Sequence, residues 1–130
     1  MVMQTKTTGP GAFLNLDLNA VPSPCFVIDL ARLEDNLRRL RQVADQSGAQ
    51  ILTALKAFSM WSTAPLVSRY LSGACCSGLH EARLARTHYV RSPDEGLVSC
   101  FAPAYKPAQM AELARLCDHI IFNTPQQIDR

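Results

Sequence analysis

The segment Ile51-Leu52-Thr53-Ala54-Leu55-Lys56 is a short apolar run that ends on a lysine. An aliphatic run of this length is typical of a buried strand. In parallel α/β folds, the carboxyl ends of the strands carry the binding and catalytic groups. A lysine that is partly desolvated there loses its proton more easily, and its neutral amine can form an imine with an aldehyde. The alternative is that Lys56 only extends its charged end into water.

The same strand–helix unit recurs along the chain. Candidate strands begin near Ile51, Ala74, Leu97 and His119, at intervals of 22 to 23 residues, and a lead-in strand is expected at 25–28. Alternating strands and helices predict right-handed crossovers and a parallel sheet. A doubly wound sheet and a barrel are both compatible with this pattern, and four such units are half of an eight-unit barrel.

Caps, prolines and glycines mark where the helices begin and end. Asp29 is expected to cap a first helix that Gly48 ends. Thr124 and Gln127 form a capping box with Pro125 at the first helical position. Because this box lies close to the last residue, we expect the domain to continue past residue 130. The other helices are expected to begin at Pro65 (and end at Gly73), at Ser77 and at Pro107.

Composition narrows the possible classes of protein. The 130 residues are 48% apolar and 18% charged, which is typical of one globular domain. The net charge of +2 is not gathered into a basic stripe, so nucleic-acid binding is not expected. The apolar runs are too short to span a bilayer, and no secretory signal is recognisable. We therefore expect a cytoplasmic protein, with residues 1–20 forming a disordered leader.

The cysteines and histidines give no sign of a disulfide framework or a metal site. The number of cysteines is odd, two of them are adjacent, and no C-x-x-C occurs, which indicates reduced thiols packed as small apolar groups. The histidines lack the spacing of metal ligands, so no metal is expected. The residues concerned are Cys25, Cys75, Cys76, Cys100, Cys117, His80, His88 and His119.

Several strings of the sequence resemble a known family. The stretch Ser23-Pro24-Cys25-Phe26-Val27-Ile28-Asp29, followed by an amphipathic helix, resembles the start of the fold-type III pyridoxal-phosphate enzymes, the relatives of alanine racemase and ornithine decarboxylase. The strings at 55–63 (Leu-Lys-Ala-Phe-Ser-Met-Trp-Ser-Thr), 77–84 (Ser-Gly-Leu-His-Glu-Ala-Arg-Leu) and 102–106 (Ala-Pro-Ala-Tyr-Lys) resemble carboxynorspermidine/carboxyspermidine decarboxylases more closely. The stretch 118–123 continues this similarity.

The resemblance implies a fold and a function. Residues 21–130 would be the N-terminal half of a (β/α)8 TIM-type barrel that binds pyridoxal 5'-phosphate, about its first four βα units, with a C-terminal β-domain lying outside this chain. Lys56 would carry the cofactor as a Schiff base. The reaction would convert carboxynorspermidine or carboxyspermidine to norspermidine or spermidine in polyamine biosynthesis, in a protein that is a homodimer. The sequence does not separate the two substrates.

The resemblance also suggests roles for other residues, and each of these roles has an alternative. Glu81 is a second candidate for cofactor binding, or a first-turn glutamate that complements the helix dipole. Lys106 lies either at the active face or in a solvated loop. Phe58 and Trp61 form either a pocket wall or core.

Two other interpretations of the whole chain stay open. One is a non-catalytic carrier of pyridoxal phosphate with the same fold, and the other is an α/β domain in which Lys56 has no special role. Because the family's phosphate-binding loop and substrate-binding carboxylates are not in this chain, we expect the 130 residues alone to be inactive.

Overall fold

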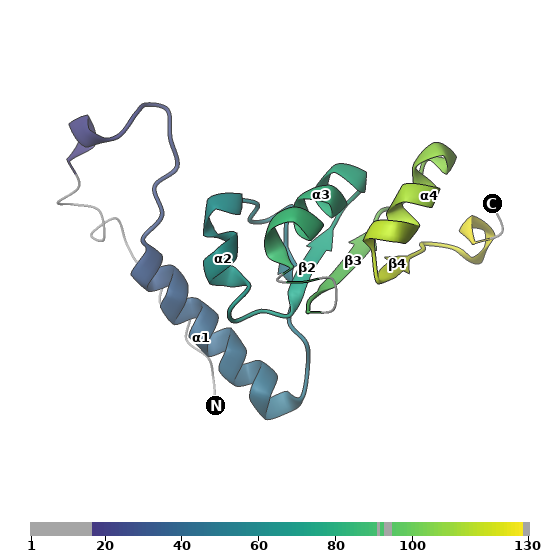
Figure 1. The fold of residues 1–130 in the computed structure, drawn as a ribbon, viewed down its shortest axis with the longest axis horizontal. Helices are drawn as coiled ribbons and strands as arrows, with labels where there is room; N and C mark the ends of the chain where they lie inside the picture. Colours follow the sequence, from purple (N-terminus) through teal and green to yellow (C-terminus); the bar gives the residue numbers. More distant parts are fainter. Residues whose placement is uncertain (1–16, 91, 93–94, 129–130) are drawn as a thin grey trace.

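The computed structural model describes residues 17–90, 92 and 95–128 (Figure 1). Four strands form one parallel sheet: β1 (Thr53–Ala54), β2 (Gly73–Cys76), β3 (Leu97–Phe101) and β4 (His119–Ile121). Their spatial order follows their order in the chain, and each neighbouring pair runs parallel. The four strands predicted near Ile51, Ala74, Leu97 and His119 are therefore confirmed.

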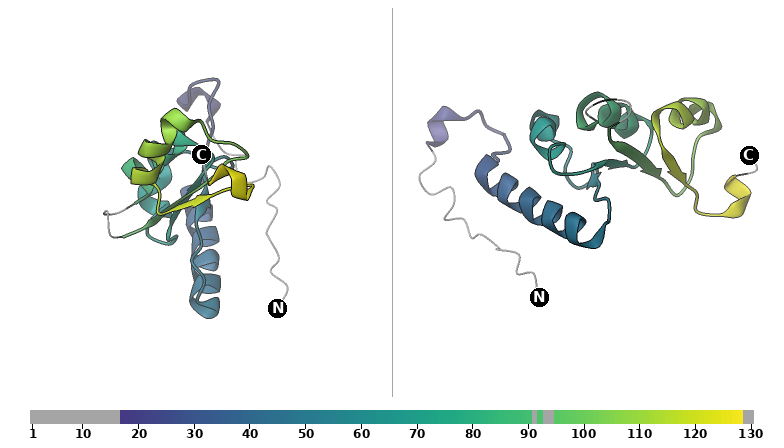
Figure 2. Two further views of the ribbon diagram at one scale, coloured as in Figure 1. Left: turned by 90° about the vertical axis from the view of Figure 1, so that its right-hand side faces the viewer. Right: turned by 60° about the horizontal axis from the view of Figure 1, so that its bottom comes forward.

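The helices that join these strands lie on one side of the sheet (Figure 2). A doubly wound sheet would carry helices on both faces. The sequential strand order and the single helical layer are the arrangement of a (β/α) barrel, so the predicted partial barrel of parallel strands is confirmed. The α-helices are α1 (Leu30–Ser47), α2 (Ala64–Val67), α3 (Leu79–Leu84) and α4 (Pro107–Leu116).

Shorter helical segments complete the described fold. A π-helical segment, η4 (Ala85–Tyr89), continues α3. Three turns are 3-10 helices: η2 (Leu18–Ala20), η3 (Trp61–Thr63) and η5 (Pro125–Gln127). Within the part of the chain that the structure describes, no helix combines the length and the apolar character needed to cross a membrane.

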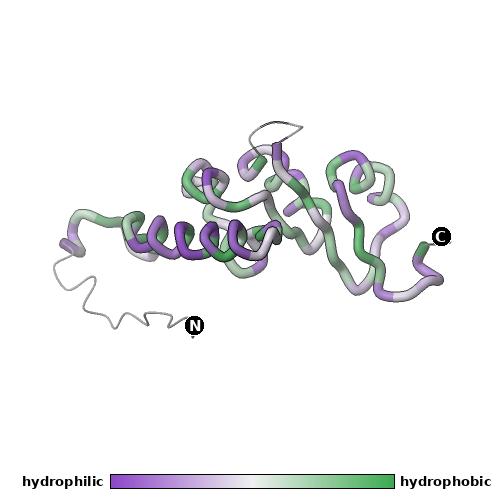
Figure 3. Tube along the Cα trace, turned by 90° about the horizontal axis from the view of Figure 1, so that it is seen from below, coloured by the Kyte–Doolittle hydropathy of each residue, from purple (hydrophilic) through white to green (hydrophobic). Residues whose placement is uncertain are grey.

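The core lies between the sheet and the helices. Alternate strand residues, including Ala74, Cys76, Val98 and Cys100, are buried beneath the helices, which contribute residues such as Val67, Leu79, Ala82 and Leu113. The strands are coloured mostly as hydrophobic in Figure 3, whereas α1 is hydrophilic along much of its length. Successive side chains of a strand point to opposite faces, so Ala54, Cys75 and Ser99, which lie opposite one another in register, share the face without helices. We call this the open face.

The first helix begins and ends as predicted. The Asp29 carboxylate accepts the N–H of Arg32 at 3.1 Å, and Gly48 ends the helix with a left-handed φ of 70°. The buried face of α1 carries Leu37, which joins the common core. A hydrogen bond from the Tyr70 hydroxyl to the Glu34 carboxylate also fastens α1 to the segment after α2.

The predicted lead-in strand at 25–28 is wrong. The structure assigns no strand there, and Phe26 is 91% exposed. A strand needs hydrogen bonds from a neighbouring strand, and no described residue pairs with this segment. Of the predicted leader, residues 1–16 lie outside the described residues, and residues 18–20 form η2, which Asp17 caps through the N–H of Asn19.

Three helix boundaries also differ from the prediction. The helix that begins near Pro65 ends at Val67 and is followed by turns, although the Leu71 N–H still reaches Val67 O at 3.0 Å. Gly78, rather than Ser77, immediately precedes α3. At the last turn, the Thr124 side chain makes no cap, and Gln127 Oε1 instead accepts the N–H of Asn123 at 2.8 Å.

Candidate functional site

The carboxyl ends of the four strands meet at one edge of the sheet, as they must in a parallel arrangement. Lys56 follows β1 at this edge. The loop Ser77–Gly78 follows β2, and the stretch 102–106 follows β3. The strings that carry the family resemblance therefore gather in one place, although they are about twenty residues apart in the chain.

A tight turn positions Lys56. The N–H of Leu55 donates to Cys75 O at 3.0 Å, which fastens the end of β1 to β2. The N–H groups of Ala57 and Phe58 both donate to Ala54 O at 3.0 Å, so the chain reverses immediately after Lys56. Leu55 is only 2% exposed, whereas Lys56 is exposed. The buried leucine holds the turn, and the lysine side chain is left free to extend from it.

The surroundings of the Lys56 amine are open. No hydrogen bond or ion pair joins it to any other residue in the described part of the chain. Burial raises the pKa of the Cys75 thiol above its usual range, and the positive charge of Lys56 acts to lower it. The charge of Lys56 therefore acts on a residue of the open face. Lys56 is thus an unpartnered primary amine close to Cys75 at the carboxyl edge.

An apolar cleft of about 540 Å³ lies along the segment that follows Lys56. Trp61 is 60% exposed and lines this cleft, so the core interpretation of Trp61 is wrong. Phe58 lines the same cleft and also packs against the core. A concave apolar surface with an aromatic wall suits a planar ring. The cleft is lined by Phe26, Ile28, Ala57, Phe58, Ser59, Met60, Trp61 and Ser62.

Glu81 lies in the first turn of α3, at the same edge. Its Oε2 accepts the backbone N–H of Ser77 at 2.6 Å. This is the local interaction expected of an acidic side chain at a helix N-terminus. The negative charge of Glu81 is also among the influences that raise the pKa of Cys75, which places the carboxylate near the open face.

The remaining polar candidates are surface residues. Lys106 is exposed and precedes α4 in the loop after β3. The three histidines, His80, His88 and His119, are all exposed. Nothing in their surroundings brings them together, so the structure leaves them outside the candidate site.

Tyr105 is a residue whose role the sequence did not reveal. Its hydroxyl oxygen accepts the N–H of Ala102 at 3.0 Å and lies within hydrogen-bond distance of Cys100 O (3.1 Å) and Ile121 O (2.8 Å). One hydroxyl hydrogen serves only one of these carbonyls at a time. Burial raises the pKa of Tyr105 to about 12, so it is a neutral hydrogen-bonding group that ties the end of β3 to the end of β4.

Comparison with known proteins identifies relatives that are named as decarboxylases. No family model matches the chain. The chain is 32% identical over 110 residues to the carboxynorspermidine/carboxyspermidine decarboxylase of Campylobacter jejuni, an alignment that covers 85% of this chain and 28% of that protein. The protein of the same name from Herminiimonas arsenicoxydans is 33% identical over 110 residues, with 85% and 29% covered. The carboxyaminopropylagmatine decarboxylase of Synechocystis is 33% identical over 116 residues, with 89% and 29% covered.

A solved structure agrees with these sequence matches. The crystal structure of carboxynorspermidine decarboxylase from Campylobacter jejuni, complexed with norspermidine, superimposes with a TM-score of 0.70 at 35% identity. The match covers 76% of this chain and 26% of that one. The chain thus spans little more than a quarter of the length of the relatives it matches. Over its aligned residues, the chain is similar to the carboxynorspermidine/carboxyspermidine decarboxylases in both sequence and fold.

Proposed function

We propose that this chain is the lysine-bearing segment of a pyridoxal-phosphate-dependent decarboxylase of carboxylated polyamines. The observation that carries the proposal is the position of Lys56. Its amine is exposed and unpaired among the described residues, at the carboxyl edge of a barrel-type sheet and beside an apolar cleft. The relatives named as decarboxylases of such compounds support the same reaction.

The residues present suit the cofactor. A primary amine without a carboxylate partner is available to an aldehyde. The small side chains of Ala54, Cys75 and Ser99 leave the open face free of bulk near Lys56. Pyridoxal phosphate, when bound, supplies a ring that accepts the electrons left behind when carbon dioxide departs. Lys56 would hold the aldehyde of the cofactor, and Phe58 and Trp61 would offer a flat ring the aromatic wall of the cleft.

Glu81 is proposed as a second residue on the cofactor side. One of its oxygens is occupied by the Ser77 N–H, so the side chain holds the loop after β2 in place at the edge where Lys56 lies. Glu81→Gln keeps an acceptor for Ser77 and removes the charge. If Glu81 serves only the helix, this variant changes thermal stability and leaves cofactor capture unaltered.

The substrate class follows from the names of the relatives. Carboxynorspermidine, carboxyspermidine and carboxyaminopropylagmatine are all carboxylated polyamines, and the Campylobacter protein was crystallised with norspermidine. We propose the same class for the protein of which this chain is part, acting as a homodimer in the cytoplasm. The five cysteines, all free, suit a reducing compartment.

Trapping of the cofactor tests the assignment of Lys56. The chain is incubated with pyridoxal phosphate, reduced with borohydride and digested, and the labelled peptide is identified by mass spectrometry. We expect the label on Lys56, its loss in Lys56→Ala, and its retention in Lys106→Ala. A label on Lys106 or on a peptide without Lys56 would refute the assignment.

A measurement of turnover distinguishes an enzyme from a non-catalytic carrier of the cofactor. A longer chain that contains these residues should release carbon dioxide from carboxynorspermidine or carboxyspermidine, and Lys56→Ala should abolish this release. Cofactor capture without any turnover in that longer chain would favour the non-catalytic carrier. We expect the 130 residues alone to be inactive, and polyamine formation by the isolated chain would contradict this expectation.

A further inference from the structure

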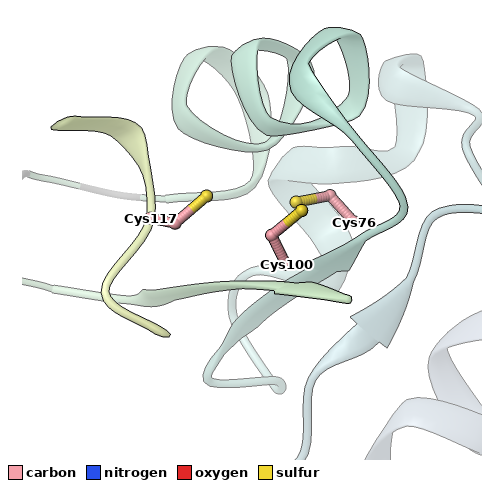
Figure 4. A group of neighbouring side chains, drawn as sticks. All are labelled: Cys76, Cys100 and Cys117. Carbon is pink, nitrogen blue, oxygen red and sulfur yellow. The ribbon is translucent and has the colours of Figure 1, made fainter. Parts of the chain in front are cut away.

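Three cysteines come together on the face of the sheet that the helices cover (Figure 4). Cys76 ends β2, Cys100 lies opposite it in β3, and Cys117 directly follows α4. The three sulfur atoms all lie within 4.8 Å of one another. Cys76 and Cys100 are 1% and 0% exposed, whereas Cys117 is half-buried. We call these residues the thiol cluster.

The spacing of the cysteines in the sequence does not predict this cluster. Cys76 and Cys100 are separated in sequence by one strand–helix unit, so the sheet register places them side by side. Cys117 reaches them because its N–H donates to Leu113 O at 2.8 Å, which continues α4 by one more bond before the chain turns into β4. The contact depends on strand register and helix packing, so short-range motifs such as C-x-x-C do not predict it.

We propose that the thiol cluster is a binding site for a soft monovalent cation, Cu(I), held by three sulfurs. A bond of about 2.3 Å from a metal to each thiolate, in a trigonal arrangement, requires sulfurs about 4 Å apart. The distances between the three sulfurs are at most 4.8 Å, which is less than 1 Å more than this arrangement requires.

The composition of the cluster favours Cu(I) over Zn(II). Thiolate ligands select soft ions, among them Cu(I). Zinc in structural sites is almost always held by four ligands, and no histidine or carboxylate of the described residues joins the three sulfurs. Cys76 and Cys100 belong to the apolar core, and Cys117 packs against it.

Cys117 is the least buried of the three cysteines. Each cysteine that coordinates the ion as a thiolate releases its proton to water, and copper stays in the +1 state throughout.

The experiment is an anaerobic titration of the chain with Cu(I) in the presence of the chelator bicinchoninate. We expect one equivalent bound, sulfur-only coordination with three ligands by X-ray absorption, and a higher melting temperature on loading. Cys117→Ala, the least buried substitution, should weaken binding roughly tenfold or more, as should Cys100→Ala.

Two other cysteines provide matched controls. Cys75→Ala changes the open face of the same strand, and Cys25→Ala removes an exposed thiol. Both should bind Cu(I) as the unaltered chain does. Circular dichroism of each metal-free variant establishes that it folds. The proposal is overturned if Cys117→Ala binds normally, if Cys25→Ala loses the site, or if Zn(II) displaces Cu(I) at equal concentration.

Discussion

Gly73 and Leu97 lie opposite each other in β2 and β3, so close that a Cβ on Gly73 would stand 2.0 Å from Leu97 O. Gly73 also has a φ of 143°, a conformation that residues with side chains rarely adopt. The Leu97 N–H donates to Ser72 O at 2.8 Å, which holds the two chains together at this point. The register of the two central strands therefore depends on the missing side chain at residue 73.

Gly73→Ala should destabilise the chain by more than about 4 kcal/mol or prevent folding, because a clash with the backbone of the neighbouring central strand cannot be relieved by rotating a side chain. Denaturant unfolding followed by circular dichroism measures the change. Gly78→Ala is the control, since a Cβ there meets nothing within 4 Å and its backbone is extended. Similar losses of stability in Gly73→Ala and Gly78→Ala would show that the close approach to Leu97 is not the cause of the destabilisation.

Asp118 joins three parts of the fold. Its Oδ2 accepts the Val98 N–H at 2.7 Å and the Arg86 guanidinium at 2.7 Å. Asp118→Ala should lower the free energy of unfolding by about 1–3 kcal/mol, because it leaves the Val98 N–H and the Arg86 Nη2 group without their acceptor, although Arg86 Nε still donates to Leu116 O. Asp35→Ala, which breaks only an exposed ion pair with Arg38, should change it by less than about 1 kcal/mol. Equal losses of stability in Asp118→Ala and Asp35→Ala would contradict a special structural role for Asp118.

The contribution of Asp118 should depend on pH. Although partial burial acts to raise it, the Val98 N–H and Arg86 together lower the pKa of Asp118 below its usual value. A carboxyl with a lowered folded-state pKa stabilises the fold above its unfolded pKa of about 3.9, and this stabilisation is lost as the pH falls through the folded value. The stability difference between the unaltered chain and Asp118→Ala should be constant near neutral pH and shrink in acid. A stability difference that grows in acid would contradict the lowered pKa of Asp118.

Tyr105→Phe should destabilise the chain by about 1–2 kcal/mol, because the hydroxyl links the backbone at Ala102 with that at Ile121. The loss should appear as a lower melting temperature and faster amide exchange in β4. Tyr70→Phe also removes a hydroxyl, from a hydrogen bond to Glu34 on the helical surface, and should leave exchange in β4 unchanged. Faster β4 exchange in both variants would point to a general loss of stability.

Trp61 is the single tryptophan, so fluorescence reports directly on the cleft beside Lys56. Because the side chain is 60% exposed, Trp61→Ala should change the free energy of unfolding by no more than about 0.5 kcal/mol. If the proposed function is right, pyridoxal phosphate should quench Trp61 in the unaltered chain and in Lys106→Ala, and much less in Lys56→Ala. Equal quenching in Lys56→Ala would place the cofactor away from Lys56.

Local signals in the sequence predicted local structure well. Asp29 and Gly48 mark the ends of α1, because a cap involves residues only a few positions apart. The capping box at Thr124 was predicted on the same grounds, but it does not form. The Gln127 side-chain nitrogen instead donates to Pro103 O at 2.7 Å, which lies far away in the chain. The segment 25–28 has the composition of a strand and no partner among the described residues, so composition alone was not enough.

The sequence by itself determined the alternation of strands and helices and placed Lys56 just beyond the first strand, since apolar runs, caps and glycines act over a few residues. Only the tertiary structure decided which side of the sheet each residue occupies. It left Trp61 exposed on a cleft, put Tyr105 between two strand ends and brought three cysteines together. These relationships depend on strand register and helix packing, which join residues that are distant in the chain and are set by the fold as a whole.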